Sequence, residues 1–232
     1  MSVLAFDTCF GRVSVAVRHP GDGGAWAITS AGEMLATGHA ERLLPMVQSV
    51  MREARVAFTD LARIAVSIGP GTFTGVRTGI AAARAIALAT GKPVCGIGTL
   101  ALMRATAVNG NEALLAGRTL AVIVDARRGE VYIQRFDGDG APLAEPQILP
   151  VDAALALLPE AGVTLVGSGG PVLQAAAASS GRQLEALMPG LEPDARALAA
   201  LAHTLPIIDI VKPHYLRAPD AKPQAAKSLP RA

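Results

Sequence analysis

The stretch SIGPGTFTGVRTGIAAARAIALA, Ser67 to Ala89, places closely spaced glycines between an apolar run and a long alanine-rich segment. A glycine loop ahead of a helix can hold a phosphate, or it can simply turn a strand into a helix. A P-loop would need a lysine beside Gly75, and a dinucleotide loop would need an acidic residue after the next strand, KPVCGIG. Both are absent. The loop therefore favours a packing role over a phosphate site.

The residues behind the loop predict a helix over about 72–90 that packs closely on its neighbours. Val76, Ile80 and Ala83 recur at helical spacing, and Gly75 and Gly79 begin a stripe of small residues beside them. Glycine inside a helix is unfavourable, so its presence indicates a close approach. If Gly79 lies in a docking face, Gly79→Arg should dissociate a partner. If it faces its own sheet, the same change should unfold the lobe.

The chain contains one structural pattern twice. Asp7 to Gly11 is a turn between the strands VLAFD and RVSVAV, and Asp125 to Gly129 is a turn between LAVIVD and EVYIQRF. After each hairpin we expect a helix, a strand, a glycine turn and a second helix. The predicted ranges are 40–54, 63–69 and 72–90 in the first half, and 151–160, 162–167 and 171–180 in the second.

This duplication predicts two similar α/β lobes. We expect an N-terminal lobe over residues 1–103, which carries the partner-binding helices, and a C-terminal lobe over 104–217. Past Lys212 the composition shifts to proline, alanine and lysine. Such a composition is typical of disorder, and we expect a disordered tail at 218–232.

The bulk composition excludes several classes of protein. Only 3% of the 232 residues are aromatic and the net charge is +2, so the chain lacks the composition of a base-stacking or polyanion-binding surface. Cys9 and Cys95 stand outside any metal or redox motif and indicate buried thiols in a reducing cytosol. No stretch reads as a signal peptide or membrane span. We expect a cytoplasmic protein without membrane contact.

Asp7 and Asp125 each end a strand beside a turn. A carboxylate there could hold a metal-bound phosphate, or it could cap the turn through nearby backbone amides. Two arginines follow Asp125, which favours the capping role at that position. For Asp7 both interpretations stay open. A weak nucleotide site would involve Asp7 with the glycine turns, namely Gly69, Gly71 and Gly167.

No catalytic set or metal site is evident in the sequence. His39 and Glu41 form H-x-E, but a zinc protease helix would need a second histidine where Leu43 stands. We expect His39 to lie at the start of a helix. No cofactor and no bound metal are expected.

Five segments resemble, in order, the landmarks of the bacterial TsaB (YeaZ) family. They are VLAFDTCFGRVSVAV, HAERLLPMVQSVM, GPGTFTGVRTGIAAARAIALATGKPVCGIGTL, VDARRGEVYIQRF and PHYLRAPDA. The resemblance covers nearly the whole chain. It implies the duplicated, two-lobed α/β fold of actin, hexokinase and the heat-shock chaperones (ASKHA, RNase H-like), which agrees with the duplication above.

The resemblance also implies a function in tRNA modification. TsaB-like proteins take part in forming threonylcarbamoyladenosine beside the anticodon of tRNAs that read codons beginning with A. They are non-catalytic partners of a homologous transferase, TsaD, and a small ATPase, TsaE, joins the assembly. The expected contact runs through the two helices of the first lobe. Because these helices carry more apolar and small residues than one lobe can bury, we also expect the chain alone to form a homodimer there. tRNA would be reached only through the complex. The expected interface residues are Leu43, Leu44, Val47, Val50, Met51, Gly75, Val76, Gly79, Ala82 and Ala83.

Two departures from the family pattern are visible. Cys9 stands where the family usually has serine or threonine, and Ala40 stands where serine is common. The first weakens the case for a nucleotide near Asp7. Two enzymatic alternatives remain at this point: a nucleotide-dependent phosphotransferase or ATPase using Asp7, and a metallopeptidase-like enzyme, for which the zinc motif is missing. Whether the chain is an enzyme is therefore undecided, with a non-catalytic role favoured.

Overall fold

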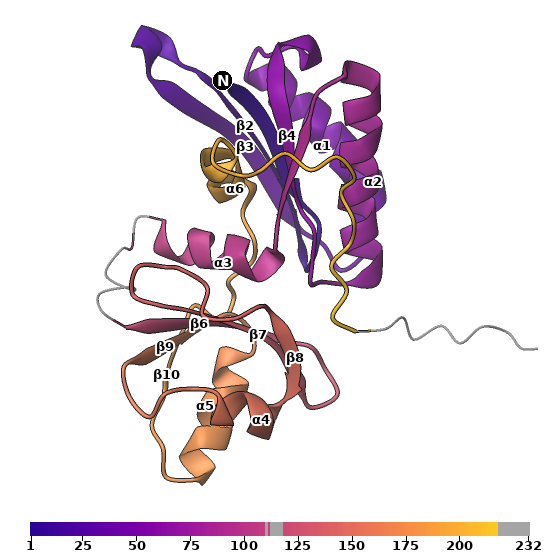
Figure 1. Ribbon diagram of the computed structural model, residues 1–232. Helices are drawn as coiled ribbons and strands as arrows, with labels where there is room; N and C mark the ends of the chain where they lie inside the picture. Colours follow the sequence, from indigo (N-terminus) through magenta and orange to yellow (C-terminus); the bar gives the residue numbers. More distant parts are fainter. Residues whose placement is uncertain (110, 112–117, 218–232) are drawn as a thin grey trace, which may run out of the picture.

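The computed structural model describes residues 1–109, 111 and 118–217 and shows two stacked lobes (Figure 1). The predicted tail at 218–232 lies outside the described residues. The strands of the first lobe are β1 (Ser2–Asp7), β2 (Arg12–Pro20), β3 (Trp26–Met34), β4 (Leu61–Ser67) and β5 (Val94–Ile97). Its helices are α1 (His39–Glu53) and α2 (Phe73–Thr90), with short 3-10 turns at Asp22–Gly24 and Phe58–Asp60.

The second lobe repeats this arrangement with shorter elements. Its strands are β6 (Thr119–Asp125), β7 (Glu130–Phe136), β8 (Gln147–Pro150), β9 (Val163–Val166) and β10 (Glu185–Leu187). Its helices are α4 (Val151–Ala156) and α5 (Gly170–Ser179). Two further helices, α3 (Thr99–Val108) and α6 (Ala195–Leu201), lie on the inner sides of the lobes.

The two sheets have the same topology. The first has the strand order β3-β2-β1-β4-β5, and the second, read in the same sense, has β8-β7-β6-β9-β10. In each, the first three strands of the lobe are antiparallel and the last two join in parallel. The predicted duplication and the ASKHA-type fold are confirmed. So are the predicted helices 40–54 and 72–90, which match α1 and α2 closely.

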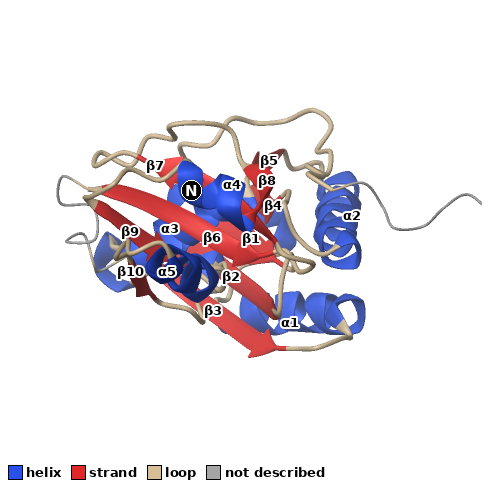
Figure 2. Ribbon diagram, turned by 90° about the horizontal axis from the view of Figure 1, so that it is seen from below, coloured by secondary structure: helices blue, strands red, loops and turns tan. Residues whose placement is uncertain are grey.

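The first sheet is buried on both faces, which explains its apolar central strand. Leu4 and Phe6 pack towards α1 and α2, whereas Val3 and Ala5 pack towards α6. Figures 1 and 2 both show α1 and α2 side by side on one face of this sheet. On the second sheet, α4 and α5 cover the outer face and α3 covers the inner one.

The lobes exchange helices across their junction. Helix α3 follows β5 of the first sheet, but Leu100 and Met103 pack with Leu120 of the second sheet. Helix α6 follows β10, but Leu198 packs with Val3 of the first sheet. The predicted boundary at 103/104 thus falls inside α3, and α6 lies in the range predicted for the second lobe while packing on the first. This exchange joins the two cores.

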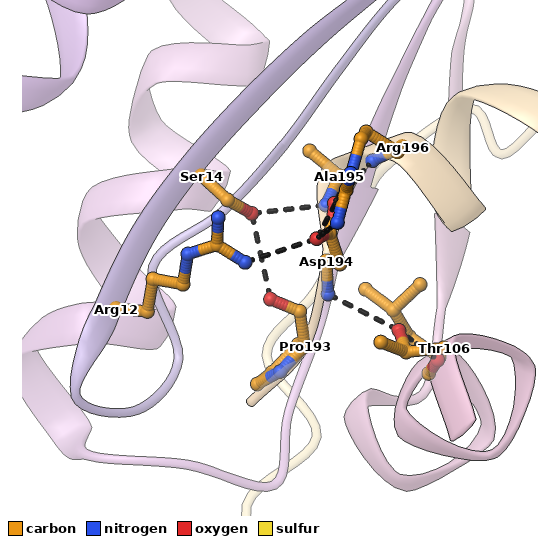
Figure 3. Close-up of polar contacts among 8 residues, drawn as sticks. Arg12, Ser14, Thr106, Pro193, Asp194, Ala195 and Arg196 are labelled. Carbon is orange, nitrogen blue, oxygen red and sulfur yellow. Dashed lines mark hydrogen bonds and ion pairs between the residues drawn. The ribbon is translucent and has the colours of Figure 1, made fainter. Parts of the chain in front are cut away.

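Asp194 is the polar centre of this junction (Figure 3). It caps α6 by accepting a hydrogen bond from the Arg196 backbone amide at 2.8 Å, and it pairs with the Arg12 guanidinium of β2 at 2.9 Å. Its own amide donates to Thr106 Oγ1 of α3 at 3.2 Å, and the next amide, of Ala195, donates to Ser14 Oγ at 2.9 Å. Burial alone would raise the pKa of Asp194, but hydrogen bonds from the two arginines outweigh it and hold that pKa below its usual value.

Replacing Asp194 should therefore loosen the junction. Asp194→Ala removes a helix cap and a mostly buried ion pair, and we expect it to lower the free energy of unfolding by about 2–4 kcal/mol. Urea denaturation followed by circular dichroism measures this. Asp152→Ala, an exposed first-turn acid of α4 that makes no cap hydrogen bond, is the matched control. Equal small losses in both variants would show that Asp194 does not hold the junction.

Candidate functional site

Asp7 ends β1 and is completely buried. Its Oδ1 accepts a hydrogen bond from the Cys9 amide at 3.2 Å, and its Oδ2 accepts one from the Ser67 hydroxyl. Cys9 Sγ lies 3.3 Å from Ser67 Oγ. The carboxylate caps the β1–β2 turn and makes its hydrogen bonds inside the protein. Of the two interpretations left open by the sequence, capping is the one that these contacts support.

Burial sets the protonation of this group. Removal from water raises the pKa of Asp7 to about 7, and the hydrogen bonds from Ser67 and Cys9 oppose that shift only in part. Burial, together with the nearby Asp7 carboxylate, likewise raises the pKa of the Cys9 thiol well above its usual value. The thiol is therefore protonated and inert, in line with the predicted buried cysteines.

The glycine loop is packed against the backbone of the β1–β2 turn. A Cβ at Gly71 would lie 2.5 Å from the carbonyl oxygen of Cys9, and one at Gly75 would collide with the carbonyl of Thr8. The Thr8 hydroxyl donates to the Gly75 carbonyl at 2.7 Å. These glycines leave space that the backbone of the β1–β2 turn fills. This agrees with the packing role that the sequence favoured over a phosphate site. Thr72 then caps α2 by accepting from the Gly75 amide at 3.1 Å.

The second lobe repeats the turn in an exposed form. Asp125 Oδ1 accepts a hydrogen bond from the Arg127 amide at 2.8 Å, the same i to i+2 contact that Asp7 makes. Its amide donates to Ser168 Oγ in the second glycine turn at 3.1 Å. Gly167, with φ of +98°, packs against the Ile123 carbonyl of β6. The predicted capping role of Asp125 is confirmed, and Asp7 and Asp125 make the same capping contact within their turns.

His39 is the first residue of α1, as predicted, and its Nε2 lies 2.8 Å from the Phe10 carbonyl oxygen. Within the described ranges, no three histidine, cysteine or acidic side chains lie together in a way that could hold a metal. No described helix is long and apolar enough to cross a membrane.

Most of the predicted interface residues lie inside the first lobe. The buried ones pack between α1, α2 and the sheet, and they are Leu43, Val47, Val50, Met51, Gly75, Val76, Gly79 and Ala83. Leu44 is 48% exposed and Ala82 is partly exposed, so these two reach the surface. A Cβ at Gly79 would lie 2.8 Å from Thr8 Oγ1 and 3.4 Å from Val66. The small-residue stripe thus faces the protein's own sheet, and Gly79→Arg is expected to unfold the lobe.

The outer side of the same two helices forms an apolar groove. It has a volume of about 670 Å³, and its walls include Ala40, Leu44, Phe73, Arg77, Ala81 and Ala85. Leu88, which also lies on α2, is 90% exposed. Of the predicted interface residues, Leu43, Leu44 and Ala82 line this groove. Phe73, Arg77, Ala81 and Ala85 were not predicted, although they recur at the i, i+4 spacing of one helix face. The apolar face is hard to recognise in the sequence because it includes the charged Arg77 and because alanine is only weakly apolar.

Comparisons with known proteins identify the family. The family model "TsaD: tRNA N6-adenosine threonylcarbamoyltransferase" matches residues 32–221. The solved structure of YeaZ from Pseudomonas aeruginosa superposes with a TM-score of 0.75 and 29% identity, covering 93% of this chain and 99% of that one. The tRNA threonylcarbamoyladenosine biosynthesis protein TsaB of Escherichia coli is 38% identical over 139 residues. The chain belongs to the TsaD/TsaB (YeaZ) family.

The extent of these matches differs among the TsaB relatives. The match to the Escherichia coli protein spans 60% of this chain and just over half, 56%, of that protein. An uncharacterised protein of Mycobacterium bovis is 36% identical over 230 residues, which cover 97% of this chain and 95% of its own length. The predicted resemblance to TsaB (YeaZ) is confirmed.

The burial of Asp7 predicts a characteristic pH dependence of stability. Because the pKa of Asp7 is higher in the folded state, at about 7, than near 3.9 in the unfolded chain, the folded state binds the extra proton between these values. Its contribution is fully present below about pH 4 and is lost as the pH rises through 7, with a slope of at most about 1.4 kcal/mol per pH unit. Asp7→Asn should flatten this part of the profile.

Urea denaturation between pH 4 and pH 8 measures the slope. Asp125→Asn is the matched control, since it makes the equivalent change in the exposed turn of the second lobe, and it should keep the wild-type profile. Identical profiles for the wild type and Asp7→Asn would contradict the raised pKa.

Proposed function

We propose that this chain is a non-catalytic partner of a TsaD-like transferase. The complex would form the threonylcarbamoyl group on the adenosine next to the anticodon of tRNAs that read codons beginning with A. The observation that carries this proposal is the exposed apolar groove between α1 and α2 in a member of this family. A TsaE-like ATPase would join the same assembly, and tRNA would bind through the complex.

The groove has the properties of a docking surface for another helix pair. Leu44 and Phe73 line it and are 48% and 36% exposed, and exposed apolar patches of this kind mark interfaces. Ala81 and Ala85 are exposed and small, so a facing helix can approach closely. A partner built on the same fold would present equivalent helices. The contact would then be pseudo-symmetric between homologues, and symmetric between two copies of this chain.

The burial of Asp7 favours a non-catalytic role for this chain over a catalytic one. Its carboxylate accepts hydrogen bonds from Cys9 and Ser67 inside the protein, and backbone atoms of the protein pack against the glycine loop. A nucleotide-dependent mechanism would need an accessible acid at that position. The chemistry is therefore assigned to the homologous partner.

A charge in the groove should separate the partners while leaving this chain folded. Ala85→Arg places an arginine on the exposed side of α2, and we expect it to weaken binding to the TsaD-like partner by about 2 kcal/mol or more, because the charge must be desolvated at an apolar contact. Isothermal titration calorimetry measures the affinity. Cellular tRNA should then lack the threonylcarbamoyl group.

Ala175→Arg is the matched control, because Ala175 is exposed on α5, the equivalent helix of the second lobe. It should bind like the wild type. Gly79→Arg should instead lose binding because the first lobe unfolds, which circular dichroism distinguishes from the folded Ala85→Arg protein. Wild-type affinity in a well-folded Ala85→Arg protein would place the docking face elsewhere.

The same face should support self-association. In the absence of the partner we expect a homodimer at micromolar concentration, since the exposed apolar groove would otherwise remain in water. Light scattering should give twice the chain mass for the wild type and a single chain mass for Ala85→Arg. A wild-type monomer across the micromolar range would contradict this expectation.

A further inference from the structure

The segment over residues 207–217, here called the C-terminal strap, runs from α6 around the edge of the first sheet to α2 (Figure 1). It begins by pairing with the edge strand β5. The Ile208 amide donates to the Val94 carbonyl at 2.9 Å, and Ile207 forms an isolated bridge with Cys95. Val211 is buried in the core of the first lobe, and Arg84 of α2 donates a hydrogen bond to its carbonyl. The strap is therefore an integral part of the first lobe.

The strap next crosses the glycine loop. The His214 amide donates to the Ile68 carbonyl at 2.7 Å, and Gly69 has φ of +108°. A Cβ at Gly69 would lie 2.6 Å from the His214 carbonyl oxygen. The strap thus occupies the space that the first glycine of the loop leaves open, and this fixes where residue 215 meets α2.

Tyr215 then contacts two residues that line the α1–α2 groove. Its ring stacks on Phe73, with centroids 5.1 Å apart and an interplanar angle of 29°. Its hydroxyl accepts a hydrogen bond from Arg77 Nε at 2.9 Å. The Arg77 guanidinium lies 3.8 Å from the centre of the Phe73 ring. The three side chains form one aromatic and cationic cluster at the rim of the groove.

The strap ends on the second lobe. Leu216 packs in the core cluster that contains Tyr132 and Val166. Arg217 donates to the Ala126 carbonyl at 2.7 Å and pairs with Glu130, so it is anchored at the turn between β6 and β7. Tyr215 is thus held between anchors on both lobes, two residues before Arg217 and four after Val211.

We propose that Tyr215 is a positioning residue for partner docking, which holds Phe73 and Arg77 in place at the rim of the α1–α2 groove. Phe and Arg side chains lose rotamer freedom when a partner immobilises them, and that loss weakens binding. Here the strap orders both side chains before the partner arrives. The second lobe and the docking face are linked by the same short segment. This inference rests on the proposed function, because it concerns the same face.

The test measures the affinity of the full-length chain for the purified TsaD-like homologue by isothermal titration calorimetry. Tyr215→Ala removes the stacking ring and the hydrogen bond, and it should weaken binding about tenfold. Tyr215→Phe keeps the ring on Phe73 and should stay within about threefold of the wild type, a recovery that a general loss of stability would not produce.

Trp26→Ala is the matched control. The Arg18 guanidinium lies 4.1 Å from the centre of the Trp26 ring, the same kind of cation–π contact, but on the β2–β3 hairpin away from the groove. It should leave the affinity unchanged. Circular dichroism melts verify that each variant is folded. If Tyr215→Ala is too unstable to purify, Tyr215→Leu preserves apolar volume without the ring and should show the same loss.

The outcomes separate this inference from the proposed function. If Ala85→Arg abolishes binding while Tyr215→Ala binds like the wild type, the positioning role is overturned and the docking face stands. Equal losses in Tyr215→Ala and Trp26→Ala would also overturn it. If Ala85→Arg leaves binding intact, the docking face itself lies elsewhere and both proposals fall together.

Discussion

The contact between the glycine loop and the β1–β2 turn is the constraint on which the rest of the structure depends. Helix α2 approaches Thr8 and Cys9 so closely that side chains at Gly71, Gly75 and Gly79 would collide with them. Asp7, at the start of the same turn, is fully buried. Burial then raises the pKa of the carboxylate, which disfavours the charge that a metal-bound phosphate would require. Asp7 is therefore a buried capping group and not an accessible acid.

The second lobe shows what the same turn looks like without that constraint. Asp125 makes the same capping contact as Asp7, but its side chain stays 35% exposed and pairs with Arg127 at 3.7 Å. Helix α5 has ten residues against the eighteen of α2. The duplicated topology therefore carries two different environments. The longer helix of the first lobe has enough surface both to close the turn and to present an outer face.

The sequence predicted the elements whose pattern is local and strong. The D-x-x-x-G turns and helices α1 and α2 follow from alternation and from helical spacing, and their positions were predicted within a few residues. The strands β3, β8 and β10 were not predicted. β8 and β10 have only four and three residues and gain their stability from pairing with longer neighbours, and β3 is an edge strand held by its pairing with β2. The helix exchange of α3 and α6 was missed because it depends on which sheet each helix reaches in space.

The predicted interface shows the same limit at the level of single residues. Periodicity identified the pair of helices that forms the outer groove, but a small-residue stripe can serve either an internal or an external contact. The deciding fact is the position of Thr8, which stands 71 positions before Gly79 in the chain and is brought against it only by the fold. No local pattern encodes that distance. Leu44 and Ala82 were the two predicted residues left facing outward.

The rotation of α2 about its axis connects folding with docking. Because Gly75 and Gly79 must face the β1–β2 turn, the residues on the opposite side of the helix must face solvent. That side carries Phe73, Arg77 and two alanines at four-residue spacing, and the C-terminal strap orders its first two members. The glycines would therefore act on the proposed docking indirectly. They fix the orientation of the helix, and the orientation determines which side chains a docked partner would meet.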